Sequence, residues 1–199
     1  MSLKDKEKWN AKYDSSICLA GREPSPWLVD HAHLLDGRGK ALDIAMGEGR
    51  NTLFAASLGY DVWGVDISDV GVSRAESLAR QNKLTIHTQI ADLDHYKIDE
   101  NTYDLILCFY FLDRRLFKGI QNGLKPGGTL VFETFTVDHL KYSSFKREWV
   151  LEKNELPESF PGLKILDYQE VDEPENETAY ASLIARKEQY FMNEENDTK

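Results

Sequence analysis

The sequence predicts an α/β fold: a doubly wound sheet of seven strands, mainly parallel, that ends in an antiparallel C-terminal hairpin. Short apolar runs alternate with helix-like segments, and five such units in succession imply a parallel sheet covered by helices on both faces. A glycine turn directly follows the first apolar run. Near the C-terminus, two strand-like runs are separated by a polar stretch with a proline, which is typical of a hairpin.

The expected elements follow in a regular order. Helices are expected at 4–13, 27–35, 50–58, 69–82 and 114–122, and strands at 41–45, 61–65, 85–90, 103–110, 129–133, 163–171 and 179–186. Ser68 and Asp113 are candidate N-caps, because their side-chain oxygens accept hydrogen bonds from the first helical turn. Gly59 marks a helix end, since glycine readily takes the left-handed conformation found there. Pro126-Gly127-Gly128 predicts a turn before the strand at 129–133.

Length and charge restrict the possible functions. A chain of 199 residues is expected to form one domain. Its net charge of −10 argues against nucleic-acid binding, which needs a basic surface. No apolar run approaches the roughly 20 residues of a membrane span, and the charged segment 1–9 is unlike a signal peptide. We therefore expect a cytoplasmic protein without nucleic-acid or membrane partners.

No metal site is expected. Cys18 and Cys108 lack metal-like spacing and are expected to be reduced thiols. His31 and His33 are two positions apart, so they do not share a face of a helix.

Residues 42–50 read Leu-Asp-Ile-Ala-Met-Gly-Glu-Gly-Arg and predict a ligand-binding turn between a strand and a helix. Gly47 and Gly49 lack a Cβ, so the backbone can turn sharply and approach a ligand closely. The next helix directs its free N–H groups and its positive dipole end to the same place. Asp66, at the end of the next strand, is placed to hold a ribose diol. Together these features predict a site for an adenosine-containing ligand, whereas the glycines alone could equally form a structural turn.

The glycine loop departs from a dinucleotide motif. Thr52 replaces the third glycine of that motif, which weakens the case for a bound pyrophosphate. A nicotinamide-dependent oxidoreductase would usually also need a second catalytic domain. This alternative is therefore disfavoured.

Further motifs accompany the glycine loop: Trp9…Tyr13, Gly21-x-x-Pro24-Ser25, Val65-Asp66-Ile67-Ser68, Ala91-Asp92-Leu93, Tyr103-Asp104-Leu105-Ile106, Leu124-Lys125-Pro126-Gly127-Gly128 and Ala185-Arg186-Lys187. With them the chain resembles the class I S-adenosylmethionine-dependent methyltransferases, and within these the tellurite-resistance type of small methyltransferase. Met46 departs from the family, which usually has a small residue or cysteine there. The resemblance implies a Rossmann-like fold with S-adenosyl-L-methionine as cofactor. We expect the chain to comprise an N-terminal helix and lid (1–30), a methyltransferase domain (31–190) and a flexible tail (191–199), which is polar.

The resemblance assigns roles to individual residues. Asp66 would take the ribose hydroxyls, and Ile67 would pack on the adenine. Asp92 would accept a hydrogen bond from the adenine amino group beside the N–H of Leu93, and carbonyls near Cys108 and Phe109 would face the methionine ammonium. The full set expected at the cofactor is Tyr13, Gly47, Glu48, Gly49, Arg50, Asn51, Asp66, Ile67, Ser68, Ala91, Asp92, Leu93, Cys108 and Phe109.

Some of these residues have a structural alternative. Asp92 can form a turn with Asp94, and Arg50 and Asn51 can be ordinary residues of a first helical turn. Tyr110, Phe111 and Trp27 can belong either to the core or to the cofactor wall.

The implied reaction is attack of a nucleophile on the sulfonium methyl group, favoured mainly by positioning and exclusion of water. A hard nucleophile such as an alcohol needs a general base. No His–Asp or Lys pair accompanies the motifs, so no catalytic residue is assigned and a thiolate or a chalcogen oxyanion is favoured as acceptor.

Tyr13, Arg114 and His139 are candidates for the acceptor pocket, with an ordinary surface position as the alternative. No long insertion supplies a substrate domain, so we expect a small-molecule acceptor and a monomer or homodimer.

The N-terminal segment is expected to cover the cofactor. Trp9 and Tyr13 are four positions apart and share a helical face. Two large aromatic side chains must be buried somewhere, either over the cofactor or against the outer helices.

A non-catalytic S-adenosylmethionine-binding domain of the same fold remains an alternative to an enzyme.

Overall fold

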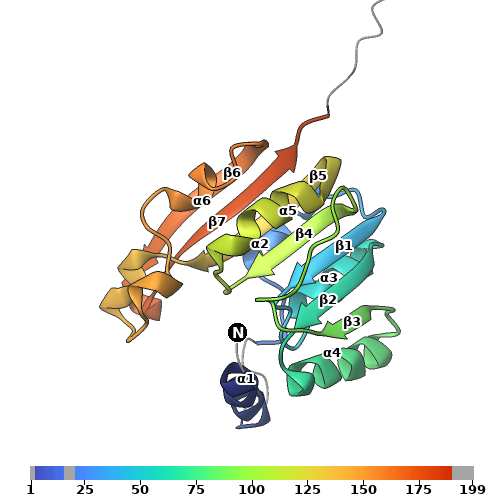
Figure 1. Ribbon diagram of the computed structural model, residues 1–199, viewed down its shortest axis with the longest axis horizontal. Helices are drawn as coiled ribbons and strands as arrows, with labels where there is room; N and C mark the ends of the chain where they lie inside the picture. The colour runs from blue at the N-terminus through green and yellow to red at the C-terminus, as the bar shows by residue number, and fades with distance from the viewer. Residues whose placement is uncertain (1–2, 16–20, 190–199) are drawn as a thin grey trace, which may run out of the picture.

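The computed structural model describes residues 3–15 and 21–189, and a sheet of seven strands in the order β3-β2-β1-β4-β5-β7-β6 forms its centre (Figure 1). The strands are β1 (Lys40–Ile44), β2 (Asp61–Asp66), β3 (His87–Ile90), β4 (Tyr103–Phe109), β5 (Leu124–Phe135), β6 (Leu163–Glu173) and β7 (Thr178–Lys187). The first five strands are parallel, and β7 pairs antiparallel with both β5 and β6. The predicted Rossmann-like sheet with its antiparallel hairpin is confirmed.

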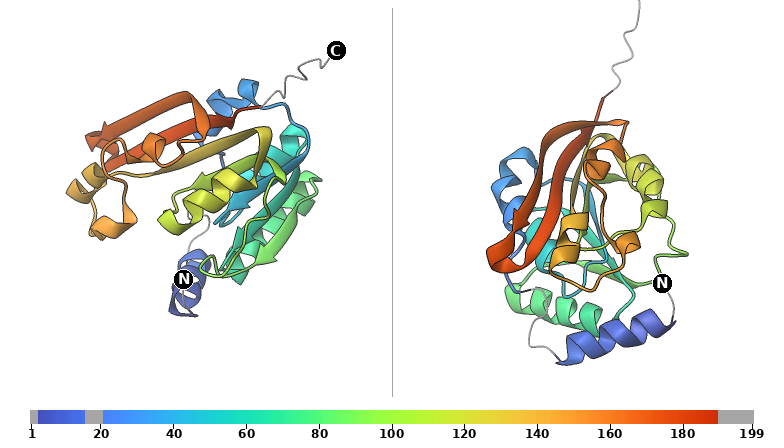
Figure 2. Two further views of the ribbon diagram at one scale, coloured as in Figure 1. Left: turned by 45° about the horizontal axis from the view of Figure 1, so that its top comes forward. Right: turned by 90° about the vertical axis from the view of Figure 1, so that its left-hand side faces the viewer.

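Helices lie on both faces of the sheet. They are α1 (Leu3–Ser15), α2 (Pro26–Asp30), α3 (Arg50–Leu58), α4 (Asp69–Asn82), α5 (Phe117–Gly123) and α6 (Glu155–Glu158), with 3₁₀ turns η1 (Ala32–Leu34), η2 (Arg114–Leu116), η3 (Val137–Lys141), η4 (Arg147–Trp149) and η5 (Pro174–Asn176). Residues of α5 and α6 pack on one face of the sheet, and residues of α2 and α3 pack on the other. α1 lies apart from the sheet and packs against α4 (Figure 2).

Local signals placed the helix ends correctly. Ser68 Oγ accepts a hydrogen bond from Gly71 N (3.0 Å) and caps α4, and Asp113 caps η2 through Arg115 N (3.0 Å). Gly59 ends α3 with a φ of 110°, a conformation that glycine tolerates well.

Several expected boundaries are wrong. The helix expected at 27–35 ends at Asp30, where the His31 ring contacts Trp27 O (2.8 Å) and Asp167 (3.0 Å) instead of continuing the helix. The edge strand β3 begins at His87, not at residue 85. Pro126-Gly127-Gly128 lies within β5, where the pairing with β4 shifts from Tyr103–Leu124 to Leu105–Thr129, so these residues form a bulge. Cys18 and the tail at 191–199 lie outside the described residues.

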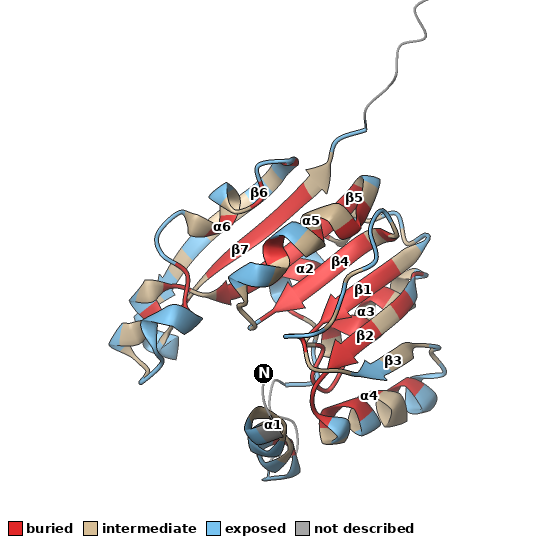
Figure 3. Cartoon of the chain, viewed as in Figure 1, coloured by how far each residue is buried: buried red, intermediate tan, exposed pale blue. Residues whose placement is uncertain are grey.

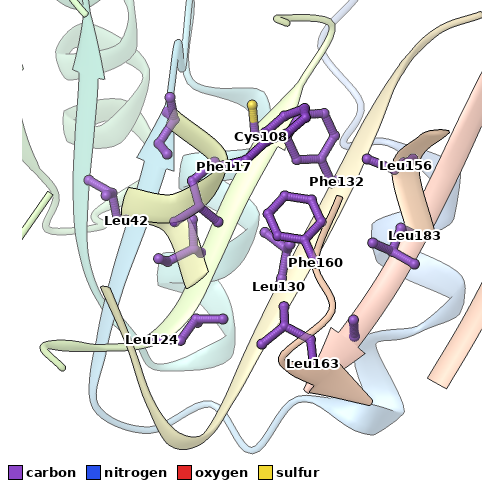
Figure 4. Packing of buried hydrophobic residues seen from close by; sticks show 14 of the residues in the cluster. Leu42, Cys108, Phe117, Leu124, Leu130, Phe132, Leu156, Phe160, Leu163 and Leu183 are labelled. Carbon is purple, nitrogen blue, oxygen red and sulfur yellow. The ribbon is translucent and has the colours of Figure 1, made fainter. Parts of the chain in front are cut away.

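The core is concentrated on the central strands, whereas the edge strands β3 and β6 are partly exposed (Figure 3). β1 and β4 are buried along nearly their whole length, as expected for parallel strands covered on both faces. Phe117, Phe132 and Phe160 converge between β5, α5 and the segment after α6 (Figure 4). Among the described residues, no helix is both long and apolar enough to cross a membrane.

Asp43 is a buried acid at the centre of the sheet. It is 2% exposed, and its Oδ2 accepts a hydrogen bond from Thr52 Oγ1 (2.6 Å) in the first turn of α3. Burial raises the pKa of Asp43 to about 7, although the hydrogen bond from Thr52 favours the charged form. Asp43 thus links β1 to the helix that follows the glycine loop.

Phe132→Ala is expected to lower the free energy of unfolding by about 3–5 kcal/mol, because it leaves a cavity among the three phenylalanines. Urea unfolding measures this loss. Phe145→Ala is the control, since Phe145 is 40% exposed and should cost much less. Equal losses in the two variants would contradict the assigned core.

Asp43→Asn is expected to flatten the pH dependence of stability. The folded pKa of Asp43, about 7, lies above its ordinary value of 3.8, so the folded state holds a proton that the unfolded chain releases. Stability is therefore lost as the pH rises from about 4 to 7. Urea unfolding at pH 5 and pH 8 should show a larger decrease for the wild type than for the variant, by a few kcal/mol. Parallel pH profiles would show that Asp43 does not carry this proton.

Candidate cofactor site

A cavity of about 840 Å³ lies at the carboxyl ends of β1, β2 and β4. The strand order reverses between β1 and β4, which is where open α/β sheets bind their ligands. The volume of the cavity falls within the roughly 300–1,000 Å³ of small-molecule sites. The lining includes Trp9, Tyr13, Arg22, Asp43, Gly47, Glu48, Arg50, Asn51, Asp66, Ile67, Phe109, Tyr110, Phe111, Phe135 and Thr178.

The loop between β1 and α3 turns through three left-handed residues. Ala45, Gly47 and Gly49 have φ angles of 57°, 55° and 81°. A Cβ on Gly49 would lie 2.7 Å from the Cβ of Ala75 in α4, and a Cβ on Gly47 would lie 2.6 Å from the hydroxyl oxygen of Tyr13. Both glycines therefore make room for other parts of the protein, a role that the sequence did not reveal.

Met46 is accommodated by a second glycine. Its side chain occupies the space in front of Gly64 on β2, where any Cβ would collide with its sulfur atom. Met46 is 7% exposed and packs with Val72 and Ala75 of α4. The larger side chain at position 46 is thus accommodated by the absence of a side chain at Gly64.

Asp66 holds the glycine loop and the start of α4 together. Its Oδ2 accepts a hydrogen bond from Gly47 N (2.8 Å), and its Oδ1 accepts one from Ser68 N (2.8 Å). Burial raises the pKa of Asp66, while these backbone N–H groups favour its charged form. Each carboxylate oxygen has a second lone pair, so Asp66 can also accept hydrogen bonds from two neighbouring ligand hydroxyls.

Tyr13 brings α1 over the loop. It is 8% exposed, and burial, followed by the charges of Asp66 and Glu48, raises its pKa. Polar contacts fix α1: Lys6 pairs with Asp69 (3.2 Å), and Ser68 Oγ donates to Asn10 Oδ1 (2.6 Å).

α1 also reaches the segment between β5 and β6. The amino group of Lys8 lies 5.5 Å from the ring centre of Trp149 in η4. This contact joins two segments that are far apart in the sequence.

The other predicted cofactor residues lie around the cavity rather than on its lining. These are Gly49, Ser68, Ala91, Asp92, Leu93 and Cys108. Asp92 Oδ1 accepts a hydrogen bond from Asp94 N (2.9 Å), the turn given as its structural alternative, and Leu93 is 1% exposed in the core. Trp27 also belongs to the core, whereas Tyr110 and Phe111 line the cavity.

Arg114, a candidate for the acceptor pocket, is not among the residues that line the cavity. Its guanidinium donates to Glu155 (2.8 Å) and to the carbonyl oxygens of Glu148 and Val150 (2.9 Å each). It therefore braces the segment between β5 and β6. No local pattern predicts this pairing, because Glu155 lies 41 positions away.

His139 lies directly behind the cavity wall. Its ring stacks on Phe135 at 4.1 Å between centroids, and it is 8% exposed. Burial lowers the pKa of His139, which favours the neutral ring. His139 therefore supports the wall residue Phe135 and does not itself line the cavity.

Tyr110, expected either in the core or in the cofactor wall, and Glu133, which was not expected at the site, stand out. Tyr110 lines the cavity with a left-handed backbone (φ 54°), and Glu133 is buried beside it. The available signal was a lone carboxylate inside the apolar run 130–135. Within the described residues, no cluster of His, Cys, Asp and Glu could hold a metal ion.

Known proteins share this architecture. Residues 41–128 match a family model described as a methyltransferase domain. The probable S-adenosyl-L-methionine-dependent methyltransferase TehB of Haemophilus influenzae is 29% identical over 165 residues, which cover 74% of this chain and 57% of TehB. The chain thus spans less than two thirds of that relative.

Two further comparisons agree. The ubiquinone biosynthesis O-methyltransferase of Coxiella burnetii is 32% identical over 106 residues, 51% of this chain and 45% of that protein. The crystal structure of TehB from Haemophilus influenzae is similar with a TM-score of 0.69 and 25% identity, over 92% of this chain and 67% of that one. In its sheet order, its glycine loop and these matches, the chain is similar to S-adenosylmethionine-dependent methyltransferases, TehB among them.

Proposed function

We propose that the protein transfers a methyl group from S-adenosyl-L-methionine to a small-molecule acceptor. The observation that carries this proposal is the Asp66 carboxylate, which faces the cavity beside the glycine loop while two backbone N–H groups fix its position. A carboxylate in this position suits a ribose diol. The relatives' names describe methyltransferases, which supports the same chemistry here.

The lining of the cavity fits the parts of the cofactor. Ile67 and Asp66 line the cavity, as do Gly47, Arg50, Asn51 and Phe109. In the proposed complex, Ile67 would pack on the adenine, and the other four would surround the methionine end. The N-terminus of α3 directs free N–H groups toward a carboxylate. Asp92 and Leu93 would contribute at the adenine from beyond the lining. When bound, the cofactor supplies a methyl group that is already activated on a sulfonium.

The chain's contribution is to position the reactants and to exclude water. Trp9 and Tyr13 cover one side of the cavity from α1, which we propose is a lid. Tyr110, Phe111 and Phe135 form an aromatic wall at the end of β4 and β5. Polarizable groups such as sulfur pack well on aromatic rings, so we propose a thiol or a heavier chalcogen oxyanion as acceptor.

A methyl-transfer screen tests the acceptor class. The protein is incubated with S-adenosylmethionine and, in separate reactions, with small thiols, selenite, tellurite and small phenols, and S-adenosylhomocysteine formation is measured. We expect turnover with a thiol or a chalcogen oxyanion. Turnover confined to phenols would contradict the proposed acceptor class but not the methyl transfer.

Asp66→Asn is expected to weaken S-adenosylhomocysteine binding by about 2 kcal/mol, roughly 30-fold, because a charged acceptor is replaced by an amide. Isothermal titration calorimetry measures the affinity. Asp61→Asn, at the exposed other end of the same strand, is the control and should bind normally. Unchanged affinity of the Asp66 variant would remove Asp66 from the ribose site.

Tyr13→Ala is expected to weaken S-adenosylhomocysteine binding about tenfold and to speed amide hydrogen exchange in residues 45–49, because the glycine loop loses its cover. Calorimetry and exchange mass spectrometry report the two effects. Tyr142→Ala, on the surface near Asp172, should change neither. If binding and exchange match the wild type, α1 is no lid.

A further inference from the structure

Glu133 is a buried carboxylate whose described partners are hydroxyl groups. It lies near the end of β5 and is 3% exposed. Its oxygens accept hydrogen bonds from Ser182 Oγ (2.8 Å) and Ser25 Oγ (3.2 Å). Within residues 3–15 and 21–189, no lysine, arginine or histidine forms an ion pair with it. A buried charge without a counter-charge is costly, so the fold keeps this carboxylate at the expense of stability.

Tyr110 connects Glu133 to the cavity. It follows β4, and its N–H donates to the backbone oxygen of Glu133 (2.7 Å). A positive φ is uncommon for an aromatic residue, and such strained residues cluster at ligand sites. The ring lines the cavity at 5.1 Å from Phe135, while burial and then the neighbouring Glu133 charge raise the pKa of the hydroxyl.

Two further side chains lie near this pair. Tyr180 contributes another neutral hydroxyl close to Glu133 and Tyr110. The Arg50 guanidinium lies 5.6 Å from the centre of the Tyr110 ring.

We propose that Tyr110 and Glu133 make the cavity selective for the cationic form of the cofactor, with Tyr110 facing the sulfonium end and Glu133 supplying the counter-charge behind it. This inference rests on the proposed function. S-Adenosylmethionine carries a positive charge on sulfur, whereas S-adenosylhomocysteine is a neutral thioether. An aromatic ring and a carboxylate both attract a cation, so the pair favours the methyl donor over the demethylated product. The same preference promotes product release after each transfer.

Calorimetric affinities for the two ligands test this selectivity. Glu133→Gln is expected to weaken S-adenosylmethionine binding about tenfold and S-adenosylhomocysteine binding less than about twofold. Tyr110→Phe keeps the ring and should reduce the donor-to-product preference modestly, whereas Tyr110→Leu removes the ring and should reduce it further. Glu100→Gln, the same change at an exposed site, should leave both affinities unchanged.

The outcomes separate this inference from the proposed function. If the wild type binds neither ligand, the proposed function fails. If both ligands bind but the variants weaken them equally, the pair has only a structural role and the selectivity proposal is overturned. Circular dichroism checks the fold of each variant. Should Glu133→Gln not fold, the affinity ratios of Tyr110→Phe and Tyr110→Leu decide the question alone.

Discussion

The Asp66 carboxylate is the contact on which the geometry of the cavity depends. One oxygen binds the N–H of Gly47 in the loop after β1, and the other binds the N–H of Ser68 at the start of α4. A single side chain therefore fixes two neighbouring strand–helix units. Ser68 extends the network, because its hydroxyl both caps α4 and contacts Asn10 of α1. The glycine loop at the site and the helix α1 above it are thus connected through the hydrogen bonds of Asp66 and Ser68.

The carboxyl ends of the strands concentrate acidic side chains below the surface. Asp43, Asp66 and Glu133 stand on three different strands and are 2%, 6% and 3% exposed. Their partners are backbone N–H groups and hydroxyls, which stabilise a carboxylate without cancelling its charge. A cationic ligand is better suited to such a site than an anionic one. The arrangement agrees with a cofactor that loses its positive charge when it reacts.

The sequence was informative wherever the chemistry is local. The glycine loop, Asp66 and the Ser68 cap depend on residues within a few positions of one another, and the hydrophobic pattern predicted the sheet with its antiparallel edge. Tyr110 and Glu133 could not be paired in advance, because they meet only through the register of β4 with β5, in which Phe109 lies opposite Glu133. The pairing of Arg114 with Glu155 could not be predicted for the same reason, since the two residues are 41 positions apart. The ends of α2 and β3 depend on tertiary contacts, which a local pattern does not contain.

Met46 and Gly64 form a steric complement across β1 and β2, and this pairing constrains how the two positions can evolve. A side chain at 64 is compatible with this loop only when position 46 is small, as no space is left in front of β2 otherwise. Substitutions at the two sites should therefore occur together, and sequences with cysteine or alanine at 46 are free to carry a larger residue at 64. In directed evolution of this chain, a library that varies position 64 alone would be depleted of folded members, whereas a library that also allows small residues at position 46 would not.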